Sequence, residues 1–164
     1  MKTMKMAKIA VMGLGLGFAG LVQAAGFGVV DLEKVVESST YLKQQNASLE
    51  QSVKPQSVKL EQITKDIDAL KQKAQAQGAN VQQIQAQYQA KVTEFQTIQQ
   101  GVQAKVQNAI QSTNTTFEAR VKQVAEQLRQ ESGLDFILNK NSALAYDAKN
   151  DLTAKMIQKV NAIK

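Results

Sequence analysis

Apolar residues recur every three or four positions through most of the chain, from residue 42 to residue 131. The first stretch has one missed place, at Gln56, and its apolar positions are Leu49, Val53, Leu60, Ile63, Ile67, Leu70 and Ala74. The second stretch restarts at Val81 and continues to Leu128 with a mean step of about 3.6 residues. This spacing is typical of amphipathic helices that pack along a heptad-like seam.

A Gly-Ala-Asn sequence at residues 78–80 separates the two stretches and is typical of a turn. We therefore predict an antiparallel helical hairpin over residues 42–131, in which each arm offers its apolar stripe to the other. At about 1.5 Å per residue the arms are roughly 50 and 75 Å long, too long for a compact domain of this size, so we expect them to project. Pro55 removes a backbone donor within the first arm, and we expect the arms to flex there and around Gly101.

The sequence patterns near the two ends of the arms predict a small β-rich body, formed by residues 25–41 and 132–164. Its expected elements are a strand at residues 27–30, a helix at 32–37, a strand at 134–138, a turn at 139–142, a return strand at 143–146 and a last helix from residue 152. Its expected core or subunit-interface residues are Val29, Val30, Phe136, Ile137, Leu138 and Tyr146. The fold class is thus α+β and predominantly α. Three short strands leave open sheet edges, which favours association of several copies.

The first 24 residues predict a cleaved signal peptide. Three lysines precede an apolar run at residues 9–22, and small or aliphatic residues precede Ala25. An uncleaved anchor helix would need a longer apolar run. We therefore expect export, with cleavage after Ala24 or Ala25.

Composition narrows the function. The sequence has no His and no Cys, so the usual general bases, nucleophiles and transition-metal ligands are missing, and we predict neither an enzyme nor a metal or cofactor site. Without the three lysines of residues 1–24, 17 Lys and Arg stand against 14 Asp and Glu, a net charge of +3. This charge is far below that of a nucleic-acid-binding protein.

The order of these elements, with the block LDFILNKNSALAYDAKNDLTAKMIQKV near the end, resembles the Skp (OmpH-like) family of periplasmic chaperones. The resemblance implies a homotrimer with a small β body, whose helical arms enclose a cavity for unfolded outer-membrane proteins and work without ATP. It also implies contact with lipopolysaccharide or another anionic membrane surface. In the corresponding stretch of this chain, residues 96–111, Lys105 is the one basic residue.

The candidate client-binding residues lie along the arms: Lys71, Lys73, Val81, Ile84, Tyr88, Lys91 and Lys105. The lysines would attract acidic clients, since complementary charge speeds encounter. The alternatives are a solvated face for the lysines and an arm-to-arm seam for the apolar residues. Two other functions also remain open for the whole chain, a structural coiled-coil spacer or tether in the cell envelope and an amphipathic helix protein that lies on a membrane.

Overall fold

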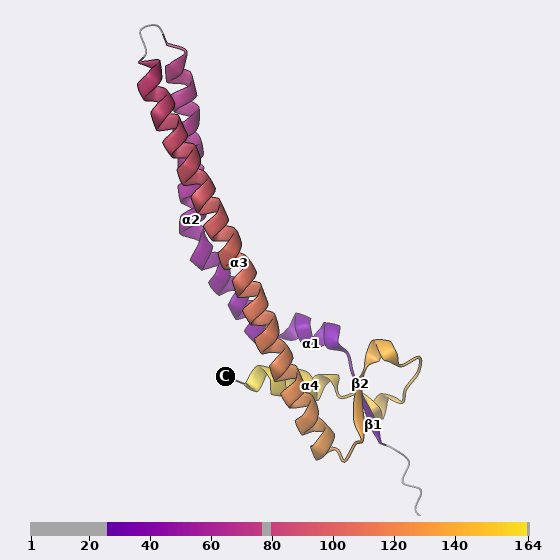
Figure 1. Ribbon diagram of the computed structural model, residues 1–164. Coiled ribbons are helices and arrows are strands. Elements are labelled where there is room, and N and C mark those ends of the chain that lie inside the picture. The colour runs from indigo at the N-terminus through magenta and orange to yellow at the C-terminus, as the bar shows by residue number, and fades with distance from the viewer. Residues whose placement is uncertain (1–25, 77–79, 164) are drawn as a thin grey trace, which may run out of the picture.

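Two long helices form a hairpin that projects from a small body, and the body holds both ends of the described chain (Figure 1). The computed structural model describes residues 26–76 and 80–163. The hairpin consists of α2, Thr40–Ala74, and α3, Val81–Glu131. The body contains β1 Phe27–Val30, α1 Leu32–Ser38, β2 Phe136–Asn139, the short 3₁₀ helices η1 Lys140–Ser142 and η2 Ala148–Asn150, and α4 Thr153–Ala162. The prediction of a mainly helical α+β chain with a long helical hairpin is confirmed, whereas the predicted signal peptide lies outside the described residues.

The sheet of the body joins the two ends of the chain. β1 and β2 pair in parallel, with Phe27 opposite Phe136, and these two rings stack with their centroids 6.2 Å apart. On the other side of β1, the Leu152 amide donates to the Val29 carbonyl oxygen at 2.8 Å. β1 therefore lies between β2 and the start of the last helix, and the hairpin serves as the long crossover that a parallel pair needs.

The predicted return strand at residues 143–146 is wrong. After β2 the chain enters η1, where the Ala143 amide donates to the Lys140 carbonyl oxygen at 3.0 Å and the Asn139 side chain accepts from the Asn141 amide. This turn leads the chain away from β2, which pairs with β1 instead. Alternating apolar residues indicate a strand but do not identify its partner.

β2 also begins two residues later than predicted. Gly133 has a φ of 62°, and the Leu134 amide donates to the Arg129 carbonyl oxygen at 2.9 Å. This pattern satisfies carbonyl groups at the end of α3, as glycine-containing helix ends commonly do. Leu134 is therefore part of the helix end rather than of the strand.

The core lies where α4 packs across the base of α3 and faces α1 and β1. Its buried residues are Val30, Val35, Val124, Leu128, Leu152, Met156 and Val160. A polar contact closes one side of it, because the Asp31 amide donates to the Thr153 Oγ1 at 2.9 Å. The base of the hairpin is thus fixed to the body by apolar packing.

The packing between the arms varies along the hairpin. Ser39 caps α2 by accepting from the Leu42 amide, and Asn80 caps α3 by accepting from the Gln83 amide. The buried residues of α2 are Ile63 and Leu70, both in its tip half, and those of α3 are Val124 and Leu128, at its base. Seam residues between these two levels are only half-buried or exposed. Within the described residues, no helix is both long and apolar enough to span a membrane.

Candidate functional site

The predicted contact residues near the tip surround an apolar hollow between the arms. Val81, Ile84 and Tyr88 of α3 lie opposite Leu70 and Ala74 of α2, and the hollow has a volume of about 220 Å³. Val81 is 56% exposed, whereas Leu70 is 8% exposed. The tip therefore combines arm-to-arm packing with accessible apolar surface. Both the packing interpretation and the client-contact interpretation of these residues stay open.

Lys91 belongs to an ionic network that crosses the arms. Its ammonium lies 2.9 Å from an Asp66 oxygen on α2 and 3.5 Å from a Glu94 oxygen on α3. Glu94 also pairs with Lys59 of α2, at 2.7 Å. The hydrogen bond from Lys91 lowers the pKa of Asp66, the one from Lys59 lowers the pKa of Glu94, and Asp66 raises the pKa of Lys91. The network therefore joins the two arms, and Lys91 is paired with carboxylates of the hairpin itself.

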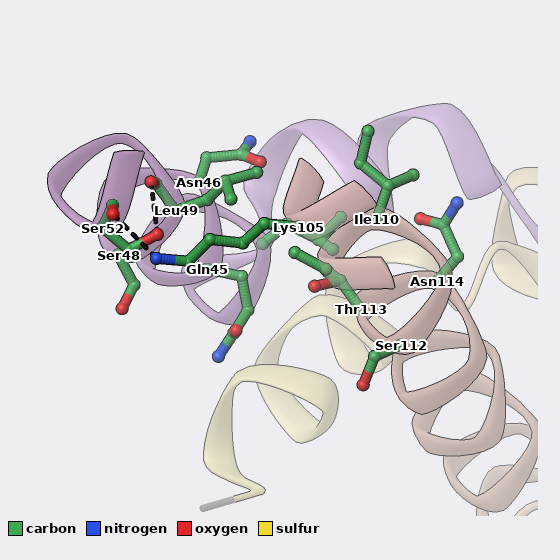
Figure 2. Close-up of a pocket in the computed structure, with 12 residues that line it drawn as sticks. Gln45, Asn46, Ser48, Leu49, Ser52, Lys105, Ile110, Ser112, Thr113 and Asn114 are labelled. Atoms are coloured by element: carbon green, nitrogen blue, oxygen red, sulfur yellow. Dashed lines mark hydrogen bonds between the residues drawn. The ribbon is translucent and has the colours of Figure 1, made fainter. Parts of the chain in front are cut away.

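Lys105 also reaches from α3 to α2 (Figure 2). Its Nζ donates to the backbone carbonyl oxygen of Ser52 at 2.8 Å. Beside it lies a hollow of about 400 Å³, whose lining includes Leu42, Leu49 and Ile110 together with polar side chains of both arms. The arms are thus bridged by a lysine where apolar packing between them is sparse.

The other two arm lysines differ from each other. Lys71 pairs with Asp68 on its own helix, at 3.1 Å. Lys73 lines a hollow beside Lys91, and its side chain makes no hydrogen bond or ion pair with the described residues. Of the four, Lys73 is the one whose side chain has no hydrogen-bonding or charged partner among the described residues.

The predicted body residues fall into two groups. Val29 and Val30 are 0% and 1% exposed and belong to the interior of the body. Phe136 is 42% exposed, and Ile137, Leu138 and Tyr146 are half-buried. The Tyr146 hydroxyl donates to an Asp151 oxygen at 3.3 Å, which holds the ring beside the start of α4.

Lys140 and Arg120 were not predicted from the sequence as functional residues, yet each connects two elements that are far apart along the chain. Lys140 pairs with Asp31 at 3.1 Å, and the Lys34 amide and Lys140 lower the pKa of Asp31. Arg120 lies over the Tyr41 ring, 4.1 Å from its centroid, and donates to the Ile163 carbonyl oxygen. Asp31 also caps α1 by accepting from the Lys34 amide, and no local sequence pattern marks Arg120 because its partners lie on other elements.

The described residues hold no group of three or more His, Cys, Asp or Glu that could bind a metal ion. The surfaces between the arms instead offer apolar hollows and hydrogen-bonding side chains. The fold is that of a helical-hairpin protein with apolar hollows along its arms.

The chain belongs to the OmpH-like family. The family model described as outer membrane protein (OmpH-like) matches residues 26–160, which include both arms and nearly the whole body. This match confirms the resemblance to the Skp (OmpH-like) family. The family is one of non-enzymatic chaperones associated with the periplasm, and membership supports a chaperone-type role in the handling of outer membrane proteins. No curated protein matches the sequence.

Proposed function

We propose that the protein is an ATP-independent periplasmic holdase that binds unfolded outer-membrane proteins between helical arms and prevents their aggregation before membrane insertion. The observation that carries this proposal is the long hairpin projecting from a small body in a chain of the OmpH-like family. A projecting hairpin is open to solvent along most of its length, so it can contact a client much larger than the body.

The physical chemistry of the clients explains the need for such arms. An unfolded β-barrel protein exposes alternating apolar residues and unpaired backbone, both of which favour aggregation in water. A protein that binds the unfolded chain lowers its free concentration by mass action, without any need for ATP. Exposed apolar residues on the arms, such as Val58, Val81 and Ile110, offer contacts of the required kind.

We also propose that the protein works as a homotrimer joined through its body. A two-stranded sheet is marginal alone and leaves an open edge on β2. Phe136 at the start of β2 is partly exposed, and Leu144 in the loop after η1 is fully exposed. Pairing of these bodies would set several hairpins side by side around a common cavity.

Within the arms, the tip residues and Lys73 are the best candidates for client contact. Val81 is exposed beside an apolar hollow, and Lys73 has no partner in the described hairpin. Lys71, Lys91 and Lys105 are already paired within the hairpin and are weaker candidates. The same pairing reduces what these three lysines offer to an anionic membrane or lipopolysaccharide surface.

The test is light scattering of the protein without residues 1–24, alone and after dilution of a urea-unfolded outer-membrane β-barrel protein into it. We expect an oligomer that gains the mass of one client and keeps the client soluble. An oligomer that leaves the client to aggregate would contradict the proposal and favour a structural spacer. Co-sedimentation with liposomes in the absence of client would favour a membrane-surface protein.

A further inference from the structure

The two weakest points of the arms lie at the same level of the hairpin. Three contacts join facing residues of the two arms: Ser52 with Lys105, Lys59 with Glu94, and Asp66 with Lys91. The numbers of facing residues therefore add up to between 153 and 157, which sets Pro55 opposite residues 98–102. Gly101 lies in this range, and glycine is the weakest helix former after proline. Apart from its chain neighbours and the backbone of its own helix, no atom lies within 4 Å of the Cβ position of Gly101, so close packing does not require this glycine.

α2 remains helical through Pro55, but its backbone hydrogen bonding is incomplete there. Pro55 has no amide hydrogen, so the carbonyl of Gln51 lacks the donor that an ordinary residue would supply. The next carbonyl along the helix, that of Ser52, lies in the same turn and is the ordinary acceptor of the Gln56 amide. Lys105 donates to that same Ser52 carbonyl from the opposite arm.

We propose that Lys105 is a latch that braces α2 beside its proline break and holds the arms in line at a single hinge. A donor bonded to a carbonyl beside the break stabilises this turn of α2, and the bond from an ammonium is stronger than one from a neutral donor. Because the donor comes from α3, the same bond also fixes the separation of the arms. Lys105 is thus a positioning residue of the hairpin rather than a client-binding one.

The contacts on either side of Lys105 indicate which part of the hairpin would move if its bond to Ser52 were lost. On its tip side the arms are braced by the network of Lys59, Asp66, Lys91 and Glu94 and by the buried Ile63. On its body side the arms border the hollow of about 400 Å³. The tip half therefore moves as one unit about the level of Pro55, and breaking the latch widens that motion.

The test is hydrogen–deuterium exchange of the full-length mature protein, followed at the amides of residues 56–59. Lys105→Met removes the donor but keeps an unbranched side chain that suits a helix. We expect exchange at these amides to become about fivefold faster, the effect of losing one modest hydrogen bond. The matched control is Lys122→Met on the same helix, since Lys122 pairs with Glu118 of its own helix, and this variant leaves residues 56–59 unchanged.

Two further variants separate a latch from an ordinary surface contact. Lys105→Arg keeps a donor of similar reach and restores slow exchange. Pro55→Ala restores the backbone donor, so Lys105→Met in that background changes exchange by less than about twofold. An equal effect of Lys105→Met with and without the Pro55→Ala substitution, or no effect beyond that of the control, would overturn the proposal. No client is present, so the outcome is independent of the holdase proposal.

Discussion

Ser39 is a polar side chain at the junction of the body and the first arm, and it is 1% exposed. Its Oγ accepts from the Leu42 amide at 3.2 Å and so satisfies one of the free donors at the start of α2. We predict that Ser39→Ala lowers the free energy of unfolding by about 1 kcal/mol, the usual effect of losing an N-cap. Thermal unfolding followed by circular dichroism measures this. Ser48→Ala, at an exposed position within α2, is the control and should not destabilise.

Substitution by alanine should have opposite effects on stability at Gly28 and at Gly101. A Cβ at Gly28 would lie 2.6 Å from Leu152 Cδ1 and 3.0 Å from Leu134 Cδ1, inside the body. Gly28→Ala should therefore destabilise the protein by about 1–3 kcal/mol, as overpacking does. A Cβ at Gly101 meets open space within a helix, so Gly101→Ala should stabilise by up to about 1 kcal/mol. Urea unfolding of both variants tests the pair, and a stable Gly28→Ala protein would show that Leu152 moves aside freely.

The cross-arm ionic network makes the stability of the contact between α2 and α3 depend on pH. The pKa values of Asp66 and Glu94 are lowered from their ordinary values of 3.8 and 4.5. A carboxyl group whose pKa is lowered by folding adds stability that is present above its ordinary pKa and is lost as pH falls through its folded pKa. We predict that the arms are held together by the network at pH 7 and loosen progressively as pH falls below about 4.5.

The variant Asp66→Asn with Glu94→Gln isolates this effect from the other carboxyl groups. The difference in melting temperature between the unchanged protein and this variant should be largest at pH 7 and shrink as pH falls below about 4.5. Glu61→Gln is the control, because Glu61 pairs with Lys65 on its own helix and should give a smaller difference. A difference that stays constant down to pH 3 would mean that the network does not hold the arms.

Helical elements could be predicted from the sequence because their apolar spacing is a local property. The spacing from Leu49 to Leu128 indicated both arms, and the first of them begins at Thr40, two residues before the predicted start at residue 42. The partner of β2 could not be predicted, because β1 precedes it by more than a hundred residues and pairing is a long-range property. For the same reason the predicted strand at residues 143–146 was wrong.

The candidate site was less accessible to sequence reasoning than the fold. Pairs on one helix, such as Lys65 with Glu61, follow from a spacing of four residues. The contacts of Lys91 and Lys105 depend instead on the register between the arms, which no local spacing fixes. The sequence identified these lysines as candidates for client contact, but it held no signal that both would be bound to the opposite arm.

At the scale of the whole molecule, the position of exposed apolar side chains predicts how copies associate. Leu144 in the loop after η1 is fully exposed and Phe136 of β2 is 42% exposed, whereas Val58 is 60% exposed on the arm. If the body joins the proposed trimer, Leu144→Asp places a charge in the interface and should reduce the mass in solution to that of a monomer, because an unpaired buried charge is strongly unfavourable.

Val58→Asp is the matched control, since it adds the same charge at an exposed apolar position outside the body. Light scattering at micromolar concentration should give the oligomer mass for this variant and a lower mass for Leu144→Asp, with the helix signal in circular dichroism unchanged in both. The reverse result, an intact oligomer with Leu144→Asp and a monomer with Val58→Asp, would place the interface along the arms. Arms joined in that way would bury the surfaces that a client must reach, so the same measurement also decides whether the hairpins are free to enclose one.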